Sequence, residues 1–233
     1  MGNSRGLTII ELIIVAAIVG ILTLVSVPTF KGMGPALRVN AAARALATEM
    51  QSARMRAVTR RASYQVQFDT TNYKFTVCTD QDTNGSITCT ISCTTPDANG
   101  LVTCTADNVD VIKICDAKGS ITCSDQPVGN VVLKVKDQQT VVFGFVSGTK
   151  DTQGDPITGA VTFSANRVTF RSFGTADKNG AVFLMPKADC LTADCATGRK
   201  DRMRAITVLM QTGRVKLWKC NTLCNSGTSW SPS

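Results

Sequence analysis

A long apolar run near the N-terminus restricts the fold of this chain more than any other feature. Residues 7–27 read LTIIELIIVAAIVGILTLVSV, and Glu11 is the one charged residue among them. A helix of about 20 apolar residues spans about 30 Å of hydrocarbon, so the run predicts a transmembrane helix. A carboxylate inside such a helix is costly and usually functional. We therefore expect Glu11 to meet a cation at the same depth.

The residues before this run, MGNSRG, are polar and carry one basic residue, Arg5. A secretory signal peptide does not fit, because the apolar run is too long, contains Glu11 and lacks an A-x-A cleavage signal. A plain single-span anchor fits the length of the run but gives no reason for Glu11.

Beyond the apolar run, the pattern predicts that the helix continues to about residue 62. Apolar residues recur there at helical spacing and form one face, which we expect to pack on a sheet: Leu46, Met50, Ala53 and Ala57. Residues that bend or loosen a helix precede this face and predict a kink: Pro28, Gly32, Gly34 and Pro35.

After Ala62 the apolar residues alternate with polar ones, as they do in half-buried strands. The runs 64–68 and 73–77 predict an antiparallel pair across a turn at 69–72. Further strands are expected at 131–135, 140–146, 160–163, 167–170, 181–185, 205–210 and 214–218, between turns rich in Gly and Asp. A long helix packed on an antiparallel sheet is an α+β fold.

The ten cysteines all follow Tyr73, which is typical of a domain that folds in an oxidising compartment. Three segments share the pattern D-x-[NK]-G-x-[IV]-T-C, and a turn at the glycine would bring the last cysteine opposite a preceding one. Each segment therefore predicts a stapled hairpin. The expected pairs are Cys78–Cys89, Cys93–Cys104 and Cys115–Cys123, with two further loops closed by Cys190–Cys195 and Cys220–Cys224.

The sequence offers no evident catalytic or metal-binding set. Histidine, the commonest general base and metal ligand, is absent, and no nucleophile has a recognisable base. Asp80, Asp82 and Asn84 resemble the start of a calcium loop. However, Ile91 stands where that loop needs its closing glutamate, so a hairpin turn is the simpler interpretation. We expect no enzymatic activity, no cofactor and no metal.

The chain has a formal net charge of +8, and its basic residues cluster in two stretches. Residues 31–61 contain seven basic residues and one acid, and residues 187–219 contain eight basic residues and three aspartates. One interpretation is that both stretches are solvated faces that keep the protein soluble. The other is binding to an anionic partner such as DNA or lipid headgroups.

Residues 6–11, GLTIIE, resemble the prepilin peptidase site of type IV pilins and type II secretion pseudopilins. The resemblance implies that a leader is cut after Gly6 and that Leu7 becomes the methylated N-terminal residue. It also implies that Glu11 pairs with the free amine of a neighbouring subunit. The family usually has phenylalanine where this chain has Leu7. Gly20 and Pro28 stand where the family's helix has them, and Pro28 is expected to take part in assembly.

The C-terminal part resembles the GspH/FimT-type branch of this family, which includes minor pilins and a secretion-system minor pseudopilin. The segments that carry the resemblance are Phe170–Gly174, Ala181–Met185, Ile206–Met210 and Thr212–Lys216. The resemblance implies a pilin fold. Its expected parts are a leader at 1–6, a helix at 7–62 with a transmembrane part at 7–27, and a β-rich domain at 63–233 with a cysteine-rich insertion at about 78–130.

The resemblance implies a minor pilin or pseudopilin of a type IV pilus or a type II secretion pseudopilus, which assembles through its N-terminal helix. Its partners would be other pilins or pseudopilins, prepilin peptidase and the bacterial inner membrane. The implied localisation is a single pass through that membrane, followed by a periplasmic or extracellular filament. Some relatives capture DNA for uptake, and the alternative function is DNA capture through a basic C-terminal region containing Gly213, Arg214, Lys216 and Lys219.

Peptide mapping under non-reducing conditions tests the hairpin pairing. We expect digests to contain Cys78 linked to Cys89, Cys93 to Cys104 and Cys115 to Cys123. Each bridge would stabilise the fold by about 3 kcal/mol, because it closes a loop in the unfolded chain. Recovery of Cys89 linked to Cys104 would contradict the scheme.

Overall fold

The computed structural model describes residues 9–71, 73–79, 91–93, 101–106, 111–116, 123–124, 131–134, 140–190, 195, 199–221 and 224–233. For residues 23–33 and for the strands between 91 and 134 it describes the backbone alone. The elements in chain order are α1 (Ile9–Arg60), β1 (Tyr64–Asp69), β2 (Lys74–Thr79), β3 (Ile91–Cys93), β4 (Leu101–Ala106), β5 (Val111–Asp116), β6 (Cys123–Ser124), β7 (Val131–Lys134), β8 (Val141–Phe143), β9 (Arg167–Phe170), β10 (Gly180–Pro186), β11 (Arg204–Leu209), β12 (Arg214–Cys220) and β13 (Trp230–Pro232).

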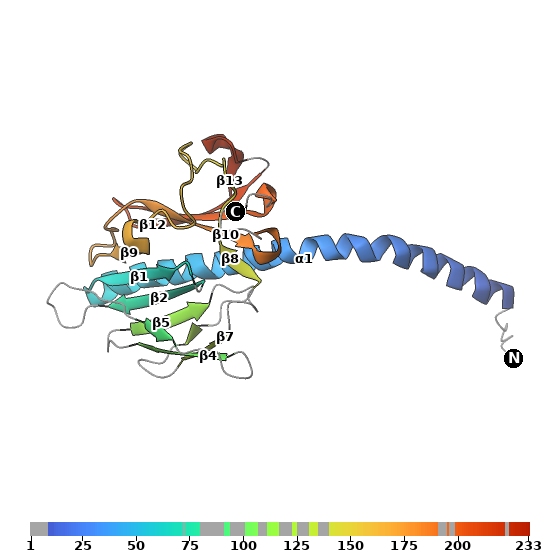
Figure 1. The fold of residues 1–233 in the computed structure, drawn as a ribbon, viewed down its shortest axis with the longest axis horizontal. Helices are drawn as coiled ribbons and strands as arrows, with labels where there is room; N and C mark the ends of the chain where they lie inside the picture. Colours follow the sequence, from blue (N-terminus) through green and yellow to red (C-terminus); the bar gives the residue numbers. More distant parts are fainter. Residues whose placement is uncertain are drawn as a thin grey trace, which may run out of the picture.

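The helix α1 is continuous over 52 residues and extends far beyond the sheets at its N-terminal end (Figure 1). It stays helical through Pro28 and Pro35, and the part of α1 outside the domain follows a gradual curve (Figure 1). Arg61, with a φ of 51°, follows the helix in the left-handed conformation that commonly closes helices. Arg60 lies in the last turn, where a cation stabilises the negative end of the helix dipole.

The membrane localisation expected from the sequence is wrong. A spanning helix needs about 20 apolar residues to cross about 30 Å of hydrocarbon. Within the described residues, no helix contains a stretch of sufficient length and apolar character. This finding contradicts the expected single pass through the bacterial inner membrane, followed by a periplasmic or extracellular filament. The expected bounds 7–27 of a transmembrane segment are not tested, because residues 7 and 8 and the side chains of residues 23–27 lie outside the described part of the chain.

The strands form antiparallel sheets that gather around the C-terminal half of α1 (Figure 1). The first sheet has the strand order β6-β5-β2-β1-β9, and the second has the order β13-β12-β11-β10-β8. A third sheet, β3-β4-β7, is built from strands between residues 91 and 134. A long helix with antiparallel sheets is the α+β fold that the sequence pattern predicts.

One face of α1 is buried against both larger sheets. The helix residues of this face are at most 8% exposed: Val39, Ala42, Ala43, Leu46, Ala47, Met50, Ala53 and Ala57. They share one apolar core with Phe68 and Phe75 of the first sheet and with Leu184 and Ile206 of the second. The many alanines let the sheets approach the helix closely. The helix face predicted from its spacing is confirmed.

The second sheet is buried on both faces, because successive residues of a strand point to opposite sides. In β10, Val182 and Leu184 belong to the core against α1. The alternate residues Phe183 and Met185 belong to a second core on the other face, together with Trp230. This second core lies under the C-terminal loops and holds them in place.

Two loops of the second core carry disulfide bridges. Cys190 is bonded to Cys195 and Cys220 to Cys224, with Cα atoms 4.1 and 5.7 Å apart. These are the two loop-closing pairs expected from the sequence spacing. Cys195 and Cys224 are buried in the second core, so each bridge ties a surface loop to the interior.

Part of the cysteine-rich insertion joins the first sheet, because β5 pairs with β2. The antiparallel register sets Cys93 opposite Cys104 and Cys115 opposite Cys123, which is the arrangement that a cross-strand bridge needs. Cys78 is disulfide-bonded, and its expected partner Cys89 lies outside the described residues. So does the calcium-like segment at 80–84. The three pairings within the insertion stay predictions.

The strand predictions hold best where the alternation is long. The predicted hairpin at 64–77 forms, with Phe68 opposite Phe75. The run at 160–163 is not a strand, and only Val161 bridges to the second sheet. There the Ala181 N–H donates to the Thr162 hydroxyl at 2.8 Å. A side-chain oxygen thus takes the place of a backbone carbonyl in the hydrogen bonds between the two segments. The sequence analysis missed β13, because three residues are too few to show a period.

Candidate functional site

The N-terminal part of α1 carries an exposed apolar surface. Its large apolar side chains are each at least 52% exposed: Ile9, Ile10, Leu12, Ile13, Ile14, Val15, Ile18, Val19, Ile21 and Leu22. Glu11, in the first turn, is the one charged residue among them. Contiguous apolar area of this extent is rare on monomeric proteins and marks a contact surface. We call Ile9–Leu22 the apolar helix surface.

The other N-terminal candidates are only partly described. Gly6 and Leu7 lie outside the described residues, and Pro28 is described by its backbone alone, as part of α1. Gly20 has no atom within 4 Å of the position that a Cβ would take. A neighbouring helix could therefore approach closely at Gly20.

Two arginines of the basic stretch 187–219 are paired with aspartates. Arg202 donates to both carboxylate oxygens of Asp189, at 3.2 and 3.1 Å, and both side chains are largely buried. Arg199 donates to Asp201 at 3.2 and 3.0 Å. This hydrogen bond lowers the pKa of Asp201 and raises the pKa of Arg199. These pairs favour the interpretation of this part of the stretch as structural rather than as an open basic face.

A third arginine of this stretch joins the sheet to the helix. Arg204 of β11 is only 3% exposed and donates to Asn40 of α1 and to the carbonyl oxygens of Asp201 and Met203. Burial lowers the pKa of Arg204, because a charged group is costly away from water. The Arg204–Asn40 bond lies where α1 enters the domain, so it helps to set the direction of the exposed part of the helix.

The turn before β12 presses against both the helix and the β9–β10 loop. Gly213 has a φ of 59°, in the left-handed region. A Cβ at this position would overlap the carbonyl oxygen of Gly174. Arg54 of α1 donates to that same oxygen at 2.9 Å. Only glycine fits here, so three distant parts of the chain meet at one point.

The strand β12 separates the basic candidates onto two faces. Arg214 and Lys216 alternate with the buried Val215, so they lie on the face away from α1. Lys219 lies on the other face, opposite Arg204 in the register of β11. The structure therefore brings Arg214 and Lys216 to one face and does not bring Lys219 to them.

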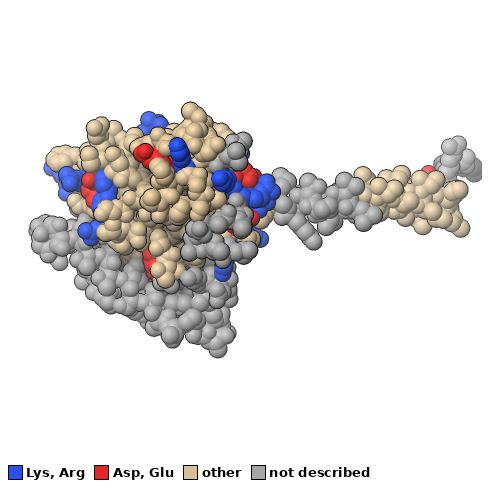
Figure 2. Space-filling model, turned by 45° about the horizontal axis from the view of Figure 1, so that its top comes forward, with Lys and Arg blue, Asp and Glu red and all other residues tan. Residues whose placement is uncertain are grey.

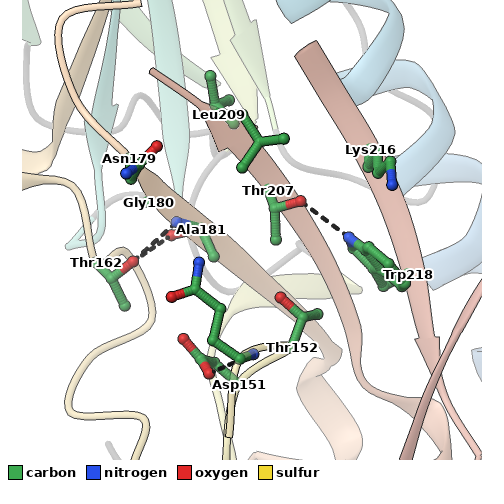
Figure 3. Close-up of a pocket in the computed structure, with 12 residues that line it drawn as sticks. Asp151, Thr152, Thr162, Asn179, Gly180, Ala181, Thr207, Leu209, Lys216 and Trp218 are labelled. Atoms are coloured by element: carbon green, nitrogen blue, oxygen red, sulfur yellow. Dashed lines mark hydrogen bonds between the residues drawn. The ribbon is translucent and has the colours of Figure 1, made fainter. Parts of the chain in front are cut away.

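Lys216 lines a groove on the face of the second sheet away from α1 (Figure 3). The groove has a volume of about 380 Å³, and Asp151 and Asn179 also line it. The Lys216 Nζ lies 5.2 Å from the centre of the Trp218 ring, a distance at which a cation is attracted to an aromatic face. The indole Nε1 donates to the Thr207 hydroxyl at 2.9 Å (Figure 3). Lys216 thus already contacts Trp218 of the same strand.

The sequence analysis missed the residues that the fold brings to the Gly213 turn. Phe173 precedes Gly174, and Arg61 lines a hollow together with Phe173. Lys and Arg side chains lie at this end of the domain, away from the N-terminal part of α1, and others lie near the point where α1 leaves the domain (Figure 2). The sequence did contain an indication of this exposure. Phe173 lies between Ser172 and Gly174, outside every predicted strand or helix, so no periodic pattern predicts its burial.

A metal centre finds no support in the part of the chain that the structure describes. There, no group of three or more His, Cys, Asp or Glu side chains lies close enough to hold an ion. Two candidate surfaces stand out among the described residues. One is the apolar helix surface, and the other contains the exposed Arg61, Arg171 and Arg214, which we call the basic end of the domain.

A scan against models of known protein families gives no match, and a search of curated proteins gives none. Among solved structures, the chain is similar to the type IV minor pilin FimU of Pseudomonas aeruginosa strain PAO1. The two chains are 14% identical, the match covers 77% of this chain and 87% of that chain, and the TM-score is 0.37.

Substitution of Gly213 tests the contact of the turn with the helix. We expect Gly213→Ala to lower the free energy of unfolding by about 2–4 kcal/mol, because the left-handed backbone and the overlap with Gly174 both oppose a Cβ. Gly148→Ala is the matched control. Gly148 has a φ of 73° with no atom within 4 Å of its Cβ position, so only about 1 kcal/mol should be lost. Equal urea-unfolding midpoints for the two variants would contradict this account.

Proposed function

We propose that this chain is a structural subunit, a minor pilin or pseudopilin, that assembles by packing the apolar helix surface against the helices of neighbouring subunits. The observation that carries the proposal is the exposure of Ile9–Leu22 on a helix whose other half is anchored in a folded domain. The GLTIIE motif at 6–11, which resembles a prepilin peptidase site, supports the same function.

Burial of the apolar helix surface supplies enough free energy for assembly. Burying one Ile, Leu or Val side chain contributes about 1.5–3 kcal/mol. A handful of such side chains therefore offsets the cost of association, which is about 4–15 kcal/mol. Packing between apolar helices has little directional preference, so a polar contact is needed to select one register.

Glu11 supplies this register in the proposed assembly. By the resemblance of the motif, the leader is removed after Gly6, Leu7 becomes the methylated N-terminal residue, and the Glu11 carboxylate pairs with the amine of a neighbouring subunit. An ion pair surrounded by apolar side chains is sensitive to displacement, because an unpaired buried charge is strongly unfavourable. The pair would therefore reject helices that are shifted by one turn.

Assembly of variants tests the proposed function. In cells that express prepilin peptidase and the remaining subunits of the filament, we expect Glu11→Ala to reduce the recovery of the chain in polymers severalfold, because the register contact is lost. The control is Thr48→Ala, since the exposed Thr48 hydroxyl bonds only to Arg44 within the helix among the described residues. The assembled chain should also have the mass expected without residues 1–6. Normal recovery of Glu11→Ala would contradict the role of Glu11.

A second candidate function is DNA capture at the basic end of the domain. The favouring observation is that Arg61, Arg171 and Arg214 are exposed. Arg171 and Arg214 lie within three residues of the contact between Gly174 and Gly213, and Arg61 lines the hollow beside Phe173. Exposed arginines would bind phosphates without reading the bases. Lys216 and Lys219 would contribute less, because one is engaged with Trp218 and the other lies on the opposite face.

Retardation of DNA by the purified protein tests this second function. We expect binding to weaken steeply with salt and Arg214→Ala to reduce the salt slope by about one, since one phosphate contact is removed. Lys219→Ala is the matched control and should bind like the unaltered protein. An absence of retardation at low salt would exclude DNA capture at this surface.

A further inference from the structure

The groove on the face of the second sheet away from α1 has a floor of strands and edges of loops. Ala181, Thr207 and Lys216, which are paired across β10, β11 and β12, form a row along the floor. Asp151, from the loop after β8, and Asn179, from the turn before β10, lie at different edges of it (Figure 3). The volume of about 380 Å³ falls within the range of about 300–1,000 Å³ that is typical of small-molecule sites.

The polar side chains at the edges of the groove are held in place by the backbone. The Oδ1 atom of Asp151 accepts the N–H groups of Gln153 and Asp155, at 2.8 and 2.9 Å. The Oδ1 atom of Asn179 accepts the Met210 N–H at 2.7 Å. A ligand would therefore meet polar groups that are already oriented, and little ordering would be needed on binding.

These bonds leave donors and acceptors of the same side chains unused. Within the described residues, the Oδ2 atom of Asp151 and the Nδ2 atom of Asn179 have no partner. The exposed Gln153, which also lines the groove, adds an amide with both a donor and an acceptor. Donors and acceptors around one groove suit a ligand with several hydroxyl groups, because each hydroxyl can both donate and accept.

The charges that line the groove favour a neutral ligand. The charged side chains among its lining residues are one acid, Asp151, and one base, Lys216. An anionic ligand would be repelled by the carboxylate of Asp151, and a cationic ligand would be repelled by the ammonium group of Lys216. The groove therefore differs from the basic end of the domain, where the exposed side chains are arginines.

Trp218 supplies an aromatic surface among these polar groups. Its indole N–H is already bonded to Thr207, so the ring offers a ligand its apolar surface rather than a donor. The Lys216 Nζ, 5.2 Å from the ring centre, makes a contact that is weak where solvent has access. A sugar ring carries C–H groups on its faces and hydroxyls at its rim. It can therefore displace Lys216 from the indole ring and accept a hydrogen bond from the same ammonium group.

We propose that this groove binds a neutral saccharide, with one sugar ring packed on Trp218 and its hydroxyls bonded to the surrounding polar side chains. These side chains are Asp151, Gln153, Asn179 and Lys216. An apolar ligand would cover polar groups without replacing their hydrogen bonds to water, which is costly. The groove lies on the face of the sheet away from α1, so saccharide binding does not depend on the packing of helices and adds a binding activity to the proposed structural role.

Saturation-transfer NMR with the full chain tests this site. The probes are four neutral disaccharides, cellobiose, maltose, lactose and N,N′-diacetylchitobiose, and the anionic digalacturonate. Because the apolar helix surface is exposed, the protein is kept in a detergent without a sugar headgroup. We expect transfer to the C–H protons of at least one neutral disaccharide, and weaker binding of digalacturonate. Absence of transfer to all four neutral probes, or tighter binding of digalacturonate, would overturn the proposal.

Substitutions in the groove establish where the saccharide binds. We expect Trp218→Ala to abolish saturation transfer and Trp218→Phe to retain part of it, because phenylalanine keeps an aromatic face. Asp151→Asn should weaken binding about tenfold, as loss of a hydrogen bond to a charged group does. Its Oδ1 atom can still accept the two loop amides, so the loop should keep its conformation. Unchanged affinity of Trp218→Ala and Asp151→Asn would place the saccharide elsewhere and overturn this site.

A pair of exposed glutamines gives a test that does not disturb the fold. Gln153→Ala should weaken binding about threefold, as loss of one neutral hydrogen bond does. Gln211→Ala is the matched control, because Gln211 is equally exposed but does not line the groove. Both variants should unfold at the same temperature as the unaltered protein and should enter polymers normally. Equal saccharide affinities of the two variants would contradict the role of Gln153 in this groove, and the proposed function in assembly would be unaffected.

Discussion

The packing of one alanine-rich helix face against two sheets is the interaction on which the rest of the structure depends. Ala43, Ala53 and Ala57 are almost fully buried, and their small side chains let strands of both sheets contact the same stretch of α1. A larger side chain on this face would force the sheets apart, because protein interiors are close-packed. The Arg204–Asn40 bond adds a polar contact that fixes the helix against β11.

This packing divides α1 into two parts with opposite exposure. From Val39 to Ala57 the apolar face is covered by the domain, whereas the apolar residues of Ile9–Leu22 remain exposed. The side chains of Ile9–Leu22 are as apolar as those of a protein core, yet they are exposed. An anchored helix that presents such a surface at a fixed angle is suited to pack with copies of itself, which is why we interpret the protein as an assembly subunit.

The arginines of the domain also fall into two groups, one bonded within the fold and one exposed to solvent. Arg202 and Arg204 donate hydrogen bonds to Asp189 and Asn40, and these bonds hold the loops and the helix in place. Arg61, Arg171 and Arg214 remain exposed around a turn that only glycine can form. A count of basic residues along the sequence mixes these two groups. The fold separates the two groups, and the exposed group is the one that can attract an anionic partner.

Local patterns in the sequence determined the fold class, the buried face of α1, the first hairpin and the two loop-closing disulfides in the described C-terminal loops. Each of these depends on residues a few positions apart, such as Leu46 with Met50 or Cys190 with Cys195. The tertiary structure alone decided that Lys219 lies away from Arg214 and that Phe173 stands beside Arg61. Those relations come from strand register and from contacts between segments far apart in the chain, and a local period carries no information about either.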